Sequence, residues 1–290
     1  MGKLITNQQV LDSPAPGQLR YGVFDVARPL AMDTRIIGSG LQFLTDHCGI
    51  TAAEYDQTCD TSPVKPIREG SELVTADPYW IVARTRCGSV GRTAEMALSA
   101  ARQQLATSAQ TRVEAVIWDS GALPTATPTL TGAGATIVTP LAPGAGAAIS
   151  ALERAFYAAG SGYAGVIHIS TRAEGALTYA GLMDPGDRVA GVYKTKKRTS
   201  IVLGDGYGIT GPADAAPAAG FAWAFITSPL TIWRSGVLPQ PPATQTFDRA
   251  LNQWDTVAEE VFAHAWDCPD VFAVQVPLAA PATAATPAVP

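Results

Sequence analysis

The clearest candidate for a ligand-binding motif is a run of glycines, Gly206-x-Gly208-x-x-Gly211, that follows an apolar segment. A dinucleotide site uses this spacing when a helix begins at the loop, because the N-terminus of the helix then holds the pyrophosphate. Here Pro212 and Pro217 follow within a stretch rich in Ala and Gly, so no helix can begin in register. The glycines are therefore interpreted as a tight turn between strands, and no cofactor is expected.

Residues suited to acid–base or nucleophilic catalysis are few and scattered. The histidines (His47, His168 and His264) have no serine partner at a hydrolase spacing, and Gly-x-Ser-x-Gly is absent. His168 lies in an apolar run and is interpreted as a hydrogen-bonded core residue. Glu259 and Glu260 are adjacent, which on a strand points them to opposite faces, so they make a poor acid–base pair. We expect a protein that is not an enzyme.

The cysteines do not form a recognisable metal-binding pattern. Cys48, Cys59, Cys87 and Cys268 include no Cys-x-x-Cys pair. A zinc site that combines the first three with His47 would need these ligands to converge in space, and no compact zinc module has their spacings. No metal is expected, and buried free thiols are the default interpretation.

One basic cluster, Lys194-Thr-Lys-Lys-Arg198, stands out in a chain with a net charge of −5 and a pI near 5.2. That balance argues against a dedicated nucleic-acid-binding protein, which usually carries a basic field, but it does not exclude a container that nucleic acid slides past. The cluster is either a solvated loop or a contact with nucleic acid or an acidic neighbour. The candidate residues for such a contact are Lys194, Lys196, Lys197 and Arg198.

The composition indicates a surface that is mostly covered. Charged residues make up 16% of the chain, against about 25% in an ordinary soluble domain. Small residues replace them, which suits a subunit with neighbours on every side better than a free monomer. The bias of a GC-rich genome is an equal alternative. No apolar run approaches the roughly 18 residues of a membrane span, so no membrane contact is expected.

The strongest element is a helix predicted over residues 94–118, which contain neither Gly nor Pro. Thr93 can cap its first turn, and Asp119-Ser-Gly121 with Pro124 ends it. At 1.5 Å per residue the helix is about 37 Å long, and it has one apolar stripe, so its other side is solvated or meets a neighbouring subunit. The stripe consists of Ala94, Leu98, Ala101, Leu105, Ala109, Val113 and Val116.

The flanking segments predict strands and shorter helices. Residues 1–45 indicate an extended arm with one or two short strands around apolar pieces such as 21–26. Two strands, 65–74 and 79–85, flank a plausible turn at 75–78. Further helices are predicted at 147–159 and 172–183, and strands at 135–139, 164–170, 199–203, 221–227, 230–234 and 272–277; the period of 256–266 does not decide between helix and strand.

This order of elements, with three short segments, resembles the Hong Kong 97-type capsid fold of tailed-phage major capsid proteins and encapsulin shells. Glu114 to Gly121 is similar to the acidic residue, apolar pair and glycine that end the encapsulin spine helix. Gly162 to Ser170 resembles a Gly-rich turn before an apolar strand ending in Ser. The segment from Ala258-Glu259 through Ala273 is similar to the C-terminal Ala-Glu and the apolar strand that follows it. The composition resembles that of actinobacterial phages.

The resemblance covers the whole chain in order and implies an α+β fold in named parts. These are an N-terminal arm, an extended loop, a long spine helix, a peripheral-domain sheet and an axial domain. The expected division is arm 1–45, extended loop 46–90, spine helix and peripheral domain 91–145, axial domain 146–220, peripheral return strands 221–279 and flexible tail 280–290.

The resemblance further implies a major capsid protein that self-assembles, as pentamers and hexamers, into an icosahedral shell around phage double-stranded DNA. It would reside in the virion after assembly in the host cytoplasm, with a portal and a separate scaffolding protein as partners. The founding family member crosslinks a loop Lys to an Asn of a neighbour, which makes Lys65 and Asn252 the candidate pair. The alternatives are an encapsulin-like compartment, a tail-tube or decoration protein, or an enzyme with scattered site residues.

Overall fold

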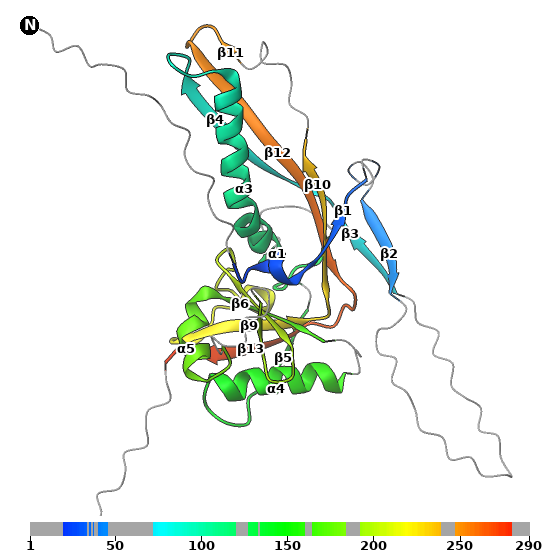
Figure 1. Cartoon of the computed structure of the whole chain (residues 1–290). Helices are drawn as coiled ribbons and strands as arrows, with labels where there is room; N and C mark the ends of the chain where they lie inside the picture. Colours follow the sequence, from blue (N-terminus) through cyan, green and yellow to red (C-terminus); the bar gives the residue numbers. More distant parts are fainter. Residues whose placement is uncertain are drawn as a thin grey trace, which may run out of the picture.

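A long helix, α3, lies along one sheet and reaches a second sheet with its C-terminal end (Figure 1). The computed structural model describes residues 20–33, 35, 37, 40–45, 72–119, 127–132, 134–159, 164–183, 192–238 and 247–279. The predicted C-terminal tail, residues 1–19 of the arm and residues 46–71 of the extended loop lie outside these residues.

Helix α3 spans Ala94–Trp118, which confirms the predicted boundaries at both ends. The Thr93 hydroxyl caps the helix by accepting a hydrogen bond from the Met96 N–H at 3.2 Å. The four middle residues of the predicted stripe, from Ala101 to Val113, are buried. The outer ones, Ala94, Leu98 and Val116, are only half-buried. The buried face consists of Ala97, Ala101, Leu105, Ala109, Gln110, Val113, Glu114, Ile117 and Trp118.

Among the described residues, five strands form the sheet that α3 covers. The strand order is β1-β10-β12-β11. Strand β4 pairs with the edge of β12 that lies opposite β10 and β11. Side chains along β4 and β12 alternate between the two faces of the sheet, and one face packs against α3. On the other face, a smaller hydrophobic cluster includes residues of β2 and β3. The strands are β1 (Arg28–Ala31), β4 (Tyr79–Gly88), β10 (Leu230–Val237), β11 (Phe247–Asp248) and β12 (Gln253–Trp266).

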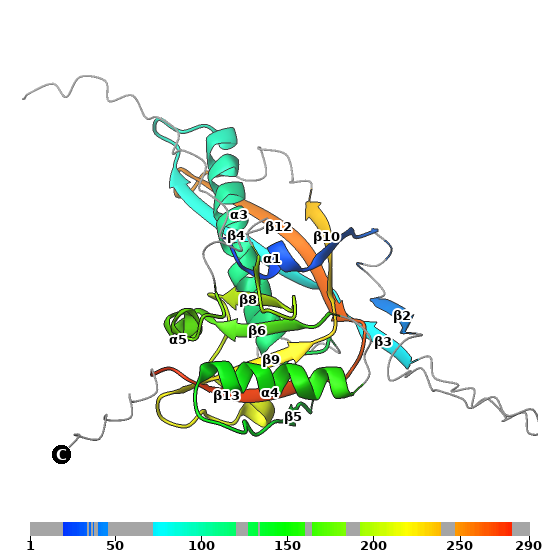
Figure 2. The same ribbon diagram turned by 60° about the horizontal axis from the view of Figure 1, so that its bottom comes forward.

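Six described strands form a second sheet at the C-terminal end of α3, and helix α4 lies across one face of it (Figure 2). Along β9, Ala222, Ala224 and Ile226 face α4, whereas Trp223 and Phe225 face the end of α3. The sheet is therefore apolar on both faces. Its order is β5 (Thr136–Ile137), β13 (Phe272–Pro277), β9 (Phe221–Thr227), β6 (Val166–Ser170), β8 (Ser200–Gly204) and β7 (Tyr193–Lys194); the helices are α4 (Ala145–Ala158) and α5 (Glu174–Tyr179), with 3₁₀ turns at Thr171–Ala173 and Pro212–Asp214.

The partners of several strands lie far along the chain, where local sequence patterns do not show them. Strand β3 (Glu72–Ala76) pairs with β2 (Leu41–Thr45), and β4 pairs with β12, so the two strands around the turn at 75–78 do not pair with each other. The segment 221–279, expected as one group of return strands, is shared between both sheets.

Three local predictions, for residues 21–26, 256–266 and 172–183, are also tested by the structure. The 21–26 piece contains a one-turn helix, α1 (Val23–Val26), and the short strand of the arm, β1, follows it. The undecided segment 256–266 is part of a single strand, β12. The 172–183 helix is shorter than predicted, because α5 ends at Tyr179.

Candidate functional site

His168 is built into the core, which confirms its interpretation as a hydrogen-bonded core residue. It is fully buried on β6, where Nδ1 lies 2.7 Å from the Tyr207 hydroxyl and Nε2 lies 3.0 Å from the Thr227 hydroxyl. Burial, and the nearby His264, lower the pKa of His168 to about 3. The ring is neutral and both its nitrogens are engaged, so it has no free atom to act as a base.

His264 on β12 is held in the same way. Its Nε2 donates to the Pro128 carbonyl oxygen at 2.9 Å, because a carbonyl oxygen can only accept. Its Nδ1 then accepts from the Tyr79 hydroxyl at 3.2 Å. Burial lowers the pKa of His264 to about 4. Both histidines therefore serve packing between strands and loops.

No group of three or more His, Cys, Asp or Glu side chains that could hold a metal occurs in the part of the chain that the structure describes. Cys87 is a free thiol, whereas Cys268 is disulfide-bonded, which corrects the expectation of free thiols. Pairing depends on which thiols approach each other in the fold, and sequence spacing does not show this. His47, Cys48 and Cys59 lie outside the described residues.

The glycine motif packs a loop against α3. A Cβ atom on Gly206 would lie 1.9 Å from the Thr111 carbonyl oxygen, and one on Gly208 would lie 2.7 Å from the Trp118 ring. Only glycine allows the loop to come this close to the helix. The motif is followed by the 3₁₀ turn at Pro212–Asp214 and not by a helix with a phosphate-binding N-terminus.

Glu114 on α3 joins three parts of the chain. It is fully buried; its Oε1 accepts from the Val23 N–H of α1 and its Oε2 from the Gly206 N–H, both at 3.0 Å. Burial raises the pKa of Glu114, an effect that the hydrogen bonds from Gly206, Val23 and Gln110 oppose. We call Glu114, α1 and the Gly206 loop the joint. In the sequence Glu114 marked the end of the helix, and its burial was missed.

The ion pair between Arg234 and Glu260 also contacts α1. Arg234 on β10 forms two hydrogen bonds to Glu260 on β12, from Nε to Oε1 at 2.9 Å and from Nη2 to Oε2 at 3.1 Å. The guanidinium also lies 4.9 Å from the ring centre of Phe24 and 5.3 Å from that of Phe262. Glu260 is buried and Glu259 is only half-buried, as expected for neighbours on a strand.

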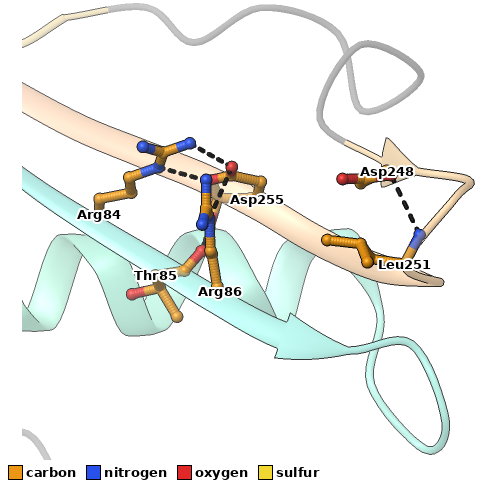
Figure 3. Close-up of polar contacts among 7 residues, drawn as sticks. Arg84, Thr85, Arg86, Asp248, Leu251 and Asp255 are labelled. Carbon is orange, nitrogen blue, oxygen red and sulfur yellow. Dashed lines mark hydrogen bonds and ion pairs between the residues drawn. The ribbon is translucent and has the colours of Figure 1, made fainter.

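Arg84 and Arg86 on the outer face of β4, with Asp255 on the neighbouring strand β12, form a cluster of three charges (Figure 3). Arg84 binds Asp255 with both nitrogens of its fork, and Arg86 Nε donates to the same carboxylate at 3.0 Å. The hydrogen bonds from Arg84, followed by the one from Arg86, lower the pKa of Asp255 to about 2. One carboxylate cannot satisfy two guanidiniums, and the Arg side chains remain 55% and 57% exposed. We call this the β4 face; it also exposes Trp80 and Val82.

The remaining candidate residues are placed in part. Asn252 lies at the turn between β11 and β12, where its side-chain oxygen accepts from the Ser89 hydroxyl at 2.8 Å. Lys65 lies outside the described residues, so the crosslink stays a prediction. The basic cluster consists of the last residue of β7, Lys194, and the turn that leads to β8, and its four cationic side chains are exposed. None of the described helices is both long and apolar enough to cross a membrane.

Comparison with known proteins identifies the fold. No family model and no curated protein matches the chain. The capsid of an empty GTA particle matches with 12% identity and a TM-score of 0.57, over 95% of this chain and 94% of that one. The capsid of Ralstonia phage GP4 matches with 10% identity and a TM-score of 0.56, over 97% and 98%. A chain of Mycobacterium phage Cain matches with 13% identity and a TM-score of 0.52, over 96% and 97%.

These similarities extend over nearly the full length of both chains, so they concern the whole architecture and not one shared motif. The chain is an α+β protein with the fold of phage capsid proteins. More particularly, this is the Hong Kong 97-type fold, and the resemblance to tailed-phage major capsid proteins is confirmed at the level of fold.

Proposed function

We propose that this chain is the major capsid protein of a tailed bacteriophage, a structural protein without enzymatic activity. Many copies, as pentamers and hexamers, assemble into an icosahedral shell that encloses double-stranded DNA. The observation that carries this proposal is the match to capsid structures over 95% or more of this chain. The environment of the two described histidines supports a structural role, because both ring nitrogens of each form hydrogen bonds within the chain.

We also assign the parts of the chain to this role. The peripheral domain consists of α3 and the five-stranded sheet, and the axial domain consists of the six-stranded sheet with α4 and α5. The extended loop leaves through β2 and returns through β3. Partners outside the chain are a portal and a separate scaffolding protein. Assembly takes place in the host cytoplasm, and the product is the virion.

The β4 face is proposed as one contact between copies. Its strand is an edge of the sheet, with Trp80 48% and Val82 54% exposed beside the two arginines. The exposed apolar residues favour contact with another protein surface, and two arginines that share one carboxylate can bind further carboxylates from it. A second copy can supply them, because residues 46–60 contain four acidic residues and neither Lys nor Arg. The four are Asp46, Glu54, Asp56 and Asp60.

Contacts of this kind link folding to assembly. Each copy that is held by its neighbours is removed from the pool that can unfold, so stability rises with protein concentration. The low content of charged residues, 16% of the chain, then follows from a surface that neighbours cover.

The test is expression of the chain, followed by sedimentation and negative-stain electron microscopy. Closed particles of uniform diameter are expected. Tubes or stacked rings would favour a tail protein, and a monodisperse monomer at all concentrations would contradict the proposal. Native particles filled with double-stranded DNA would distinguish a capsid from an encapsulin-like compartment filled with protein.

A further inference from the structure

Positive charge is concentrated at one turn of an otherwise acidic chain. Lys occurs at five positions in the sequence, and three of them are Lys194, Lys196 and Lys197. With Arg198, four cations fall within five residues, and all four side chains are exposed. Like charges this close repel one another, so the turn gains from a negatively charged partner.

The turn is held in place from below by a buried carboxylate. Glu153 on α4 is 4% exposed, and it accepts hydrogen bonds from the hydroxyls of Thr195 at 2.5 Å and Thr199 at 2.6 Å. The backbone closes the turn with hydrogen bonds from the Thr195 N–H to the Thr199 oxygen and from the Arg198 N–H to the Thr195 oxygen. Since both threonines point inward, the cations between and beside them point outward.

A fifth cation extends this surface onto the helix. Arg154 follows Glu153 on α4, is exposed, and lines a shallow pocket together with Lys197. Lys197 also lies over the ring of Tyr157, at 5.7 Å from the ring centre. Within the described part of the chain, none of these five cations takes part in an ion pair. We call the five residues the basic turn: Arg154, Lys194, Lys196, Lys197 and Arg198.

We infer that the basic turn contacts the phosphate backbone of duplex DNA, independently of base sequence. Three of its five cations are lysines, which act on phosphates as mobile point charges, whereas specific protein contacts favour Arg and large aromatic anchors. In a chain with a net charge of −5, DNA is attracted only where cations gather. The basic turn gathers five cations without an ion pair among the described residues, whereas the two arginines of the β4 face share the carboxylate of Asp255. The inference rests on the proposed function, in which the shell encloses DNA.

The test measures binding of a fluorescent duplex to the purified, unassembled chain by anisotropy, with two unrelated DNA sequences and salt between about 50 and 200 mM. The triple variant K194A/K196A/K197A is compared with R92A/R102A/R249A, which removes three exposed arginines elsewhere. Each variant changes the net charge by the same amount, from −5 to −5 − 3 = −8. Any difference between them therefore reports the position of the charge.

At the low end of the salt range, the lysine variant is expected to bind at least about 10-fold more weakly than the wild type, with a salt slope flatter by roughly 2–3. The arginine variant is expected to stay within about twofold of the wild type, and both DNA sequences to bind equally. A K194R/K196R/K197R variant keeps the charges and should keep the binding. Circular dichroism checks that each variant is folded.

Equal weakening by both triple variants would overturn the inference, and so would binding of a polyglutamate peptide without binding of the duplex. Particle formation, followed in parallel by sedimentation, separates this result from the proposed function. Particles without DNA binding reject only the basic turn as a phosphate contact. Absence of particles rejects the shell, whatever the DNA result.

Discussion

The joint and the β4 face both contain charged residues, but they use them in opposite ways. At the joint, Glu114 is fully buried, and both its oxygens accept hydrogen bonds from the same chain. On the β4 face, Arg84 and Arg86 share the single carboxylate of Asp255 and remain more than half exposed. The first arrangement is complete within one chain, whereas the second leaves hydrogen-bond donors for another molecule.

The difference teaches which charges shape a subunit and which connect it to others. A buried carboxylate without its partners would be costly, so Glu114 fixes the positions of α1 and the Gly206 loop on α3. An exposed pair contributes little to the stability of one chain, so the β4 face is free to serve contacts between chains. Substitutions in the two regions should therefore change different measurements.

The largest effect is expected at Gly206 of the joint. In G206A the new Cβ would lie 1.9 Å from a backbone oxygen of α3, so the loop must move away and lose its hydrogen bond to Glu114. We expect the free energy of unfolding to fall by about 3 kcal/mol or more, or no soluble protein to form. Urea denaturation of the unassembled chain measures this.

The control is G175A on α5, where a Cβ would meet nothing within 4 Å. Alanine is the better helix former, so this variant should be unchanged or more stable by up to about 1 kcal/mol. Equal destabilisation by both substitutions would show that close packing at Gly206 is not the cause.

Glu114 itself comes next. E114A leaves the N–H groups of Val23 and Gly206 buried without an acceptor, and should cost about 2–4 kcal/mol of unfolding free energy. E114Q keeps one acceptor oxygen and should cost less. A loss below about 0.5 kcal/mol for E114A, typical of a surface substitution, would contradict the role of the joint.

The buried histidines predict how stability depends on pH. His168 and His264 have folded-state pKa values lowered to about 3 and about 4, from 6.5. Between these values and 6.5 the unfolded chain binds more protons, so stability falls as pH falls below 6.5. Each histidine contributes up to about 1.4 kcal/mol per pH unit.

H168Q should be less stable than the wild type at pH 7 and lose stability more slowly on acidification. Glu114 has a raised pKa and acts in the opposite direction, but it is present in both proteins and cancels from the difference. Denaturation curves at several pH values between about 5 and 7 give the slopes. Identical slopes would mean that His168 is not held neutral.

The smallest effect on stability, and the clearest effect on assembly, is expected on the β4 face. R84A/R86A should leave the unassembled chain about as stable as the wild type, because both side chains are largely exposed. It should raise the protein concentration needed for particle formation several-fold. R102A/R172A removes the same charge from other exposed positions and should assemble normally; a defect in both would point to net charge alone.

The sequence predicted best where local signals act alone. Helix α3 has a cap at Thr93, a Gly- and Pro-free interior and a stop at Asp119, and its predicted bounds agree with the structure. The last part of β12, from Glu260 to Trp266, is buried at every position because both faces are covered, so its period of two is hidden. The pairing of β3 and β4 depends on partners far along the chain, which no local pattern specifies.

For the basic turn and the glycine loop, the sequence likewise predicted the residues but not their contacts. The basic turn was evident from its lysines, but its support by Glu153 was not, because α4 and the turn meet only in the fold. Likewise, the Gly206 motif was recognised, but its hydrogen-bond partner was not, because Glu114 on α3 lies 92 residues earlier in the sequence. In both cases the residue types were visible and their partners were not.

The most direct test is an electron cryo-microscopy reconstruction of assembled particles at a resolution that shows side chains. We predict copies of this chain around fivefold axes, with Arg84 or Arg86 bound to a carboxylate of a neighbouring copy. Glu114 should contact only its own chain. Particles in which the β4 face is open to solvent, or in which Glu114 binds a neighbour, would contradict the division between charges that shape the subunit and charges that connect it.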